Sequence, residues 1–327
     1  MSSLKNKQLK IVLVVAAYWI VSIGLVFLNK RILSHKDIDI PVFITFIQCL
    51  VAVFCSFLLQ YISKRTNHNI CVYKWNWLTH VQLLNVTLLF IAMILFNNLT
   101  LKMIPVSFYN IVRALSTVFN LIFTRLILKR SVSLPAIICT FIVIIGFLCG
   151  MGELGEGMLS LVPALVGTLA SMFVSLFAIF TKSSLEYVNQ NPWMFQTFNN
   201  INALFIIFPL LPITGELSLV INQMHYIFSP EIFFSLLLSG VLGFLIGICT
   251  TLQIQYTSAL THNISGTAKS CFQTILAVII NKETNHTFTW WIGSVFVLVG
   301  SGMYSYVCNK EMTAAHNKLL KSNVNSI

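Results

Sequence analysis

The residues that could carry chemistry are a few charged side chains inside long apolar segments. Lys269 stands in residues 260–280, LTHNISGTAKSCFQTILAVII, a stretch of membrane-spanning length. Arg113 stands in a second such stretch, residues 106–128. A charge at such a depth is costly unless it faces a watery cavity or a partner. Both cations are therefore candidate ligand-binding residues.

No carboxylate is placed to neutralise these cations. All nine Asp and Glu residues fall in loops, in tails or at the ends of apolar segments. The simplest partner is a ligand, and that ligand is an anion. The planar fork of arginine and the compact charge of lysine together suit phosphate or pyrophosphate oxygens. The lack of buried acids argues against proton coupling and against an enzyme, so no catalytic residue, metal or cofactor is expected.

Amide side chains form a second group of candidates. Thr197, Phe198, Asn199 and Asn200 come early in another apolar stretch, residues 193–213. Asparagine offers donors and an acceptor, which can match the edge of a purine base. Hydrogen bonding between helices is the alternative, because amides also serve that role in membranes. The remaining candidates lie beside the cations or at the end of a segment: Lys30, Asn110, Ser265, Gly266, Thr267 and Gln273.

Two of these assignments compete with structural roles. Lys30 ends the first apolar segment, where a long side chain can extend to the membrane surface. Asn110, like the pair Asn97 and Asn98, fits helix packing better than ligand binding. The eight cysteines lie mostly inside apolar segments without a CxxC pair, which is typical of buried free thiols.

The elements that position these residues follow from composition. The 327 residues are 57% hydrophobic and only 9% charged, whereas about 25% is usual for soluble domains. Apolar runs near 20 residues recur throughout, so we expect an all-α polytopic membrane protein embedded in the lipid bilayer. About ten spans are expected, near residues 10–33, 40–63, 79–101, 106–128, 132–151, 159–181, 193–213, 231–256, 260–281 and 287–308.

Charge sets the expected orientation. The net charge of +11 resides mostly in loops and tails on alternate sides of the spans, which is the positive-inside pattern and does not indicate nucleic acid. Both termini are therefore expected in the cytosol. The whole chain, 1–327, is expected to form one transmembrane domain, with a first half at 10–151, a second half at 159–308 and a cytosolic tail at 309–327.

The two halves are expected to form inverted five-helix repeats. Arg113 lies eight residues past Pro105 and Lys269 eight residues past Thr261, on spans that run in opposite directions. Each cation is then roughly 12 Å from its own end of a hydrocarbon core about 30 Å thick. An inverted repeat with a site at the interface of its halves would give this placement.

Several runs resemble the nucleotide-sugar transporter family of the drug/metabolite transporter superfamily. They are HNISGTAK at 262–269, FYNIVRALSTVFN at 108–120 and TFNNINA at 197–203. Members that carry GDP-sugars have an FYNN motif, which corresponds here to residues 197–200 with both asparagines kept. Their GALNK motif corresponds to residues 265–269, where only Lys269 is kept in place.

The resemblance implies a carrier that imports a GDP-sugar, GDP-fucose before others, from the cytosol into the Golgi lumen in exchange for GMP by alternating access. It also implies that the asparagines face the guanine and that the lysine segment faces the ribose, phosphates and sugar. The sequence leaves open another GDP-sugar such as GDP-mannose, a phosphorylated sugar, and a nucleotide-binding membrane receptor without transport. It does not distinguish the Golgi from the endoplasmic reticulum, or a monomer from a homodimer.

Overall fold

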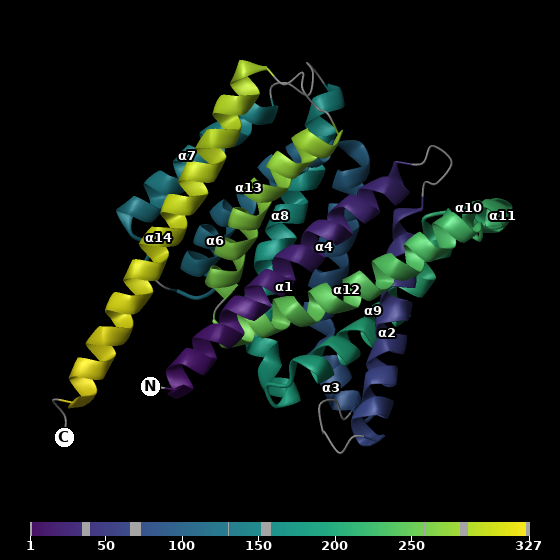
Figure 1. Ribbon diagram of the computed structural model, residues 1–327, viewed down its shortest axis with the longest axis horizontal. Coiled ribbons are helices and arrows are strands. Elements are labelled where there is room, and N and C mark those ends of the chain that lie inside the picture. Colours follow the sequence, from purple (N-terminus) through teal and green to yellow (C-terminus); the bar gives the residue numbers. More distant parts are fainter. Residues whose placement is uncertain are drawn as a thin grey trace.

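A computed structural model describes residues 2–34, 40–65, 73–129, 131–151, 158–257, 259–281 and 287–324. These residues form a bundle of helices, and no strand occurs among them (Figure 1). The long elements are α1 (Ser2–Leu33), α2 (Pro41–Arg65), α4 (Leu84–Met103), α5 (Val106–Arg113), α6 (Leu115–Leu126), α7 (Leu134–Met151), α8 (Met158–Ser184), α9 (Pro192–Ile213), α12 (Pro230–Tyr256), α13 (Ala259–Asn281) and α14 (Phe288–Val324). Shorter elements are α3 (Trp77–Gln82), the 3₁₀ helix η2 (Leu185–Val188), α10 (Glu216–Asn222) and α11 (Met224–Ile227).

The apolar helices confirm a polytopic helical membrane protein. In the described part of the chain, eight helical segments are long and apolar enough to cross a bilayer, and two shorter apolar helices cover 134–150 and 268–280. Together they match the ten spans expected from hydropathy. The fourth span differs in detail, because α5 ends at Arg113 and α6 begins at Leu115. The amide of Ala114 bonds to both the Asn110 and Ile111 carbonyls, which tightens the turn between the two helices.

Helix packing relates the two halves of the chain. When α1, α2, α4, α5–α6 and α7 are exchanged with α8, α9, α12, α13 and α14, the main packing pairs are preserved. Thus α4 packs on α8 as α12 packs on α1, and α6 packs on α7 as α13 packs on α14. The pairs α2–α9, α5–α13 and α7–α14 join equivalent helices. This pattern fits two five-helix repeats, which must run in opposite directions because each holds an odd number of spans.

Small residues bring α7 and α14 into backbone contact. A Cβ atom built on Gly146 would lie 2.7 Å from the carbonyl oxygen of Gly293. One built on Gly293 would lie 2.6 Å from the backbone nitrogen of Gly150. The spacing of Gly146 and Gly150 predicts close helix packing, and the contact with Gly293 confirms that it occurs within the chain.

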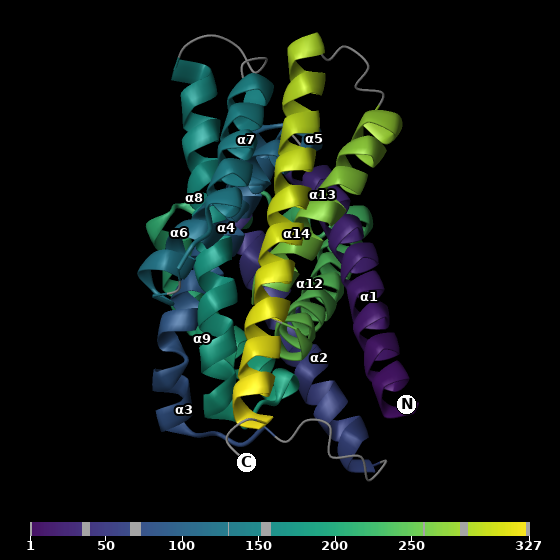
Figure 2. The same cartoon turned by 90° about the vertical axis from the view of Figure 1, so that its left-hand side faces the viewer.

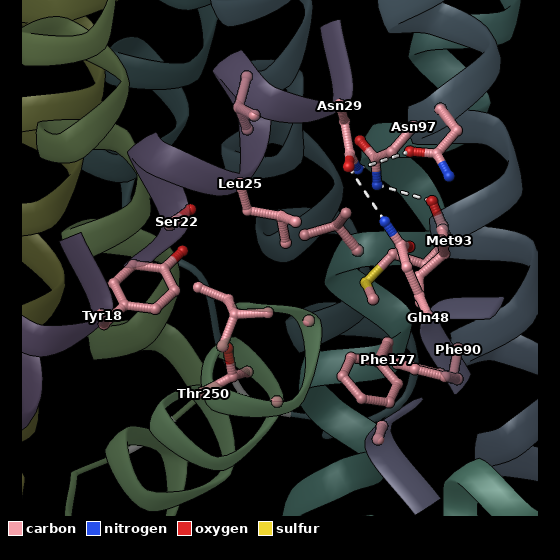
Figure 3. A pocket seen from close by; sticks show the side chains of 18 of the residues that line it. Tyr18, Ser22, Leu25, Asn29, Gln48, Phe90, Met93, Asn97, Phe177 and Thr250 are labelled. Carbon is pink, nitrogen blue, oxygen red and sulfur yellow. Dashed lines mark hydrogen bonds between the residues drawn. The ribbon is translucent and has the colours of Figure 1, made fainter. Parts of the chain in front are cut away.

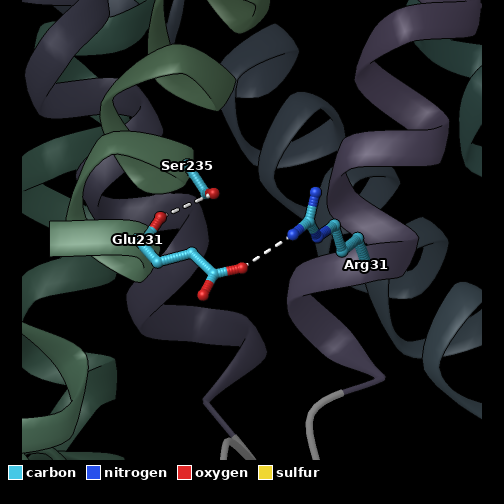
Figure 4. Close-up of polar contacts among 3 residues, drawn as sticks. All are labelled: Arg31, Glu231 and Ser235. Carbon is cyan, nitrogen blue, oxygen red and sulfur yellow. Dashed lines mark hydrogen bonds and ion pairs between the residues drawn. The ribbon is translucent and has the colours of Figure 1, made fainter. Parts of the chain in front are cut away.

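The start of α1 and the end of α14 lie at the same end of the bundle, here called the terminal end (Figure 2). Two acids fasten helices at the opposite end. The buried Glu216 carboxylate accepts hydrogen bonds from the backbone amides of Val42 and Phe43, at the start of α2. An acid suits that place because the first amides of a helix lack partners within it. Glu231 pairs with Arg31 at 2.6 Å in an exposed contact between α12 and α1 (Figure 4).

Candidate functional site

A cavity with about 180 Å³ of water-accessible space lies in the middle of the bundle. Its walls come from α1, α2, α4, α5, α8, α9, α12 and α13, so both halves contribute. Its polar or charged lining residues are Tyr18, Ser22, Asn29, Gln48, Asn97, Asn98, Tyr109, Arg113, Gln196, Asn200, Thr250, His262 and Lys269. Several of them are seen in Figure 3.

Lys269 is 4% exposed and reaches this cavity from α13. Its Nζ atom donates a hydrogen bond to the Ser22 hydroxyl, 2.7 Å away on α1, and lies 5.8 Å from the centre of the Tyr18 ring. The ring face adds a weak cation–π attraction. A hydroxyl and a ring only partly compensate a buried ammonium charge. The group therefore remains a strong potential partner for an anion.

Arg113 reaches the same cavity from the last turn of α5. Among the described residues no ion pair engages it, and no Asp or Glu lines the cavity. The described acids are elsewhere: Glu216 and Glu231 at the end opposite the termini, and Glu186 and Glu311 outside the cavity lining. The described wall thus holds two cationic groups without an acid, and a cavity with one sign of charge concentrates ligands of the other.

His262 joins the helices on the terminal side of the cavity. Its Nδ1 atom is 3.0 Å from the Gln253 Oε1 atom on α12, and its ring meets the Tyr18 ring edge-on at 5.0 Å. On the same face of α13, the Ser265 hydroxyl accepts a hydrogen bond from the Trp19 indole at 3.0 Å. These contacts hold α13 against α1 and α12. They therefore fix the place from which Lys269 extends.

Residues 197–200 of α9, the run TFNN, are divided between the cavity lining and the protein interior. Asn200 lines the cavity, and its amide nitrogen donates to the Gln196 carbonyl at 2.8 Å. Asn199 is fully buried outside the lining, and neither of its amide atoms has a partner among the described residues. Phe198 packs 4.6 Å from the His80 ring, and the Thr197 hydroxyl donates to a backbone carbonyl of its own helix. Only Asn200 of this segment is placed to touch a ligand directly.

Comparison with known proteins adds an independent observation. Residues 9–305 match the sequence profile described as the Triose-phosphate Transporter family. The chain belongs to this family. It is 44% identical over 326 residues to "GDP-fucose transporter 1" of Nematostella vectensis, covering 96% of this chain and 94% of that one. It is 37% identical over 322 residues to "GDP-fucose transporter, Golgi" of Drosophila melanogaster, covering 96% and 95%.

A solved structure described as "Crystal structure of protein" has the same fold as this chain. It superposes with a TM-score of 0.57 at 13% identity, covering 92% of this chain and 98% of that chain. At that identity the match concerns the arrangement of the helices alone. It agrees with the packing of the ten apolar helices described above.

The other candidates from the sequence lie around the cavity rather than in its lining. Lys30 donates from Nζ to the carbonyls of Leu101, at 2.7 Å, and Ile104, at 2.9 Å. Asn110 and Gln273 are buried, and the amide atoms of both lack partners among the described residues. Ser265 and Gly266 lie against α1, where a Cβ atom on Gly266 would be 3.5 Å from the Tyr18 hydroxyl. The side chain of Thr267 lies outside the described residues. A role for each of these in binding stays a prediction.

Sequence reasoning missed part of this family member's cavity. Tyr18 and Ser22 line it from α1, and Asn29 and Gln48 line it from α1 and α2. Each is a single polar residue inside an apolar span, a signal that was present but weak. Asn97 and Asn98 were assigned to helix packing. Asn98 does bond to Asn29 on α1, yet it also faces the cavity.

Proposed function

We propose that this protein carries GDP-fucose into the Golgi lumen in exchange for GMP, by alternating access of the central cavity. The observation that carries the proposal is the cavity that holds Arg113 and Lys269 and has no acid among its described lining residues. The names of relatives that match nearly the whole chain favour GDP-fucose over other GDP-sugars, and the name of the Drosophila relative favours the Golgi. Those names also favour a carrier over an enzyme.

The cavity offers a distinct chemistry for two parts of such a substrate. The guanidinium of Arg113 and the ammonium of Lys269 bind the diphosphate, displacing the ammonium from the Ser22 hydroxyl. Asn200 and the neighbouring Gln196 carry donors and acceptors for the guanine edge. Asn199, directly behind Asn200, supports that wall rather than contacting the base.

Exchange follows from the charges of the cavity. An empty cavity that closes around Arg113 and Lys269 must desolvate two cations without an anion, which is unfavourable. A nucleotide phosphate compensates them, so the transition between the two open states occurs in the loaded form. GMP and GDP-fucose both supply that phosphate, which permits a one-for-one exchange. With both termini in the cytosol, as the loop charges predict, the terminal end of the cavity admits the GDP-sugar.

Transport by purified protein in liposomes tests the proposal. Liposomes preloaded with GMP, or with buffer alone, are offered GDP-fucose, GDP-mannose and UDP-galactose. GDP-fucose uptake that requires internal GMP and is lost in Lys269→Ala supports it. Lys64→Ala, an exposed lysine at the end of α2, is the control and should transport normally.

Three other outcomes would contradict parts of the proposal. Equal uptake of GDP-mannose would remove the assignment to fucose. Full uptake without internal GMP would remove obligatory exchange. Nucleotide-dependent stabilisation of the protein without flux would favour a membrane receptor instead.

A further inference from the structure

Three amides from three helices form a hydrogen-bonded cluster in the cavity wall (Figure 3). Gln48 of α2 donates from Nε2 to the Oδ1 atom of Asn29 on α1, at 3.0 Å. Asn29 donates from Nδ2 to the Oδ1 atom of Asn98 on α4, at 3.3 Å. Asn98 donates in turn to the Thr45 hydroxyl at 3.1 Å. We call Asn29, Gln48 and Asn98 the amide cluster.

The amide cluster has a counterpart on the other half of the chain. The run Phe43-Ile-Thr-Phe-Ile-Gln48 of α2 parallels Phe195-Gln-Thr-Phe-Asn-Asn200 of α9. The packing pattern makes α2 and α9 equivalent helices, and they cross the bundle in opposite directions. Gln48 is therefore the repeat equivalent of Asn200. An inverted repeat places such a pair on opposite sides of the membrane midplane, here in the wall of one cavity.

The amide cluster lies about two helical turns along α1 from the residue that holds Lys269. Ser22, which holds Lys269, precedes Asn29 by seven residues. Seven residues are two helical turns, so both side chains face the same way, roughly 10 Å apart along the axis. The cavity thus carries Lys269 about two helical turns from the amide cluster, and the amide wall at Asn200 belongs to the other side of the midplane.

A GDP-sugar has the same order of groups along its length: base, diphosphate, sugar. We propose that the amide cluster is the subsite for the sugar. The inference rests on the proposed function, in which the base lies at Asn200 and the diphosphate at Lys269. Amides can both donate to and accept from hydroxyls, which is what sugar recognition requires.

The hydrogen bonds of the amide cluster fix the orientation of the donors and acceptors that its side chains leave unused. Both N–H groups of Gln48 are used, one by Asn29 and the other by the Ser239 hydroxyl at 3.3 Å. Among the described residues no bond engages its Oε1 atom, so that oxygen can accept from a sugar hydroxyl. Asn29 donates one N–H to Asn98, Asn98 donates one N–H to the Thr45 hydroxyl, and each keeps a second N–H. The cluster is thus held in place while part of its bonding capacity remains for a ligand.

Apolar side chains beside the amide cluster favour a sugar that lacks one hydroxyl group. Leu25 lies one turn before Asn29 on α1, Leu101 lies one turn after Asn98 on α4, and both line the cavity. Fucose is a 6-deoxyhexose and carries a methyl group where mannose carries a hydroxymethyl group. An extra hydroxyl against leucine side chains would lose its water without gaining a partner. Such a pocket discriminates by about 100-fold at most, because it offers no steric barrier.

Two exchange reactions separate this inference from the proposed function. GMP-for-GMP exchange needs the base and phosphate sites only, whereas GDP-fucose-for-GMP exchange also needs the sugar subsite. Gln48→Met keeps the length of the side chain and removes its polar atoms. It should lower GDP-fucose uptake about tenfold and leave GMP exchange near the wild-type rate. Gln60→Met is the matched control on the same helix, because Gln60 bonds to the Tyr73 carbonyl away from the cavity.

A second variant tests the apolar wall in the opposite direction. Leu25→Ser should raise uptake of GDP-mannose relative to GDP-fucose, again with GMP exchange retained. Two results would overturn the sugar subsite. One is an equal loss of GMP exchange and of GDP-fucose uptake in Gln48→Met. The other is an unchanged ratio of GDP-mannose uptake to GDP-fucose uptake in Leu25→Ser. Wild-type protein that exchanges GMP but takes up no GDP-sugar would instead overturn the proposed function itself.

Discussion

Lys30 and Lys182 occupy equivalent positions in the two halves and cap helices at opposite ends of the bundle. Lys30 of α1 donates to carbonyls at the end of α4, including that of Leu101 at 2.7 Å. Lys182 of α8 donates to carbonyls at the end of α12, including that of Ile254 at 3.0 Å. The last carbonyls of a helix lack partners within it and carry partial negative charge, which a lysine compensates.

These two lysines join parts of the bundle that alternating access must separate. The main packing partner of α1 is α12, and that of α4 is α8, so each lysine bonds across the boundary between these two pairs. Opening either end of the cavity along this boundary would break the bond at that end. A hydrogen bond to a charged group contributes about 1.5–3 kcal/mol, which is enough to shift a two-state population about tenfold or more.

Neutral variants of the two lysines should therefore shift access in opposite directions. Lys182→Met should expose the cavity to the terminal end, and Lys30→Met should expose it to the other. The measurement is labelling by an impermeant thiol reagent of a cysteine placed at Thr250, in a background without the native cysteines. Faster labelling from the terminal side in Lys182→Met and slower labelling in Lys30→Met are expected. Changes of the same sign would show that the lysines only stabilise the fold.

The hydrogen bond between Lys269 and Ser22 leads to a second prediction, which concerns the stability of the protein rather than a labelling rate. Ser22→Ala removes an acceptor that the buried ammonium uses when no ligand is present. The ligand-free protein should lose stability, because a charged group then lacks a partner, at a cost of about 1–3 kcal/mol. A bound phosphate replaces the hydroxyl, so the GMP-bound protein should lose less.

Thermal unfolding in detergent, with and without GMP, measures both states of Ser22→Ala. The rise in Tm on adding GMP should be larger for the variant than for the wild type. Ser56→Ala serves as the control, because the Ser56 hydroxyl donates to the Ala52 carbonyl of its own helix and has no other bond among the described residues. A rise in Tm that is the same in all three proteins would mean that the phosphate does not displace the ammonium from Ser22.

A third prediction concerns two glycines of α12 that line the cavity. A Cβ atom on Gly247 would overlap the side-chain amide of Gln196, whereas one on Gly243 would lie 3.9 Å from the Cβ atom of Gln48. Gly247→Ala should therefore displace the Gln196 side chain from its place in the cavity wall and weaken GMP binding about tenfold, as overpacking costs about 1–3 kcal/mol. Gly243→Ala should bind GMP normally. Equal GMP affinity in the two variants, measured by equilibrium binding, would exclude Gln196 from the nucleotide site.

The ten apolar helices, and the position of two cations inside them, could be predicted from the sequence because each depends on local properties. Hydropathy over about 20 residues is enough to recognise a span, and a charge within a span is conspicuous by its cost. The split between Asn199 and Asn200 could not be predicted in the same way. Neighbouring residues on a helix point about 100° apart, and which of them faces the cavity depends on how α9 is rotated against α2 and α4.

The amide cluster was harder still to predict. Asn29, Gln48 and Asn98 lie on three different helices, and nothing in their local sequence indicates that their side chains meet. Their bonds exist because α1 and α2 both pack on α12 and α4 closes the group from the other side. The internal similarity of α2 to α9 becomes informative only when packing has established that these helices are equivalent.

The contact between α7 and α14 gives a last prediction, which separates folding from transport. A Cβ atom on Gly293 would lie 2.6 Å from the backbone nitrogen of Gly150 and 2.7 Å from the carbonyl oxygen of Gly146. Backbone atoms in two packed helices cannot move aside as a flexible side chain can, so Gly293→Ala should destabilise the protein by about 1–3 kcal/mol or more. Gly302→Ala, where a Cβ atom meets open space, is the control and should have the wild-type Tm.

Neither α7 nor α14 lines the cavity among the described residues, so the folded fraction of Gly293→Ala should bind GMP with unchanged affinity. A lower Tm with normal affinity would establish this contact as the scaffold that joins the two halves. An unchanged Tm would show that the helices move apart at little cost and would contradict the scaffold role. A lower GMP affinity of the folded fraction would show that this contact also shapes the cavity, because α7 and α14 reach it only through their neighbours among the described residues.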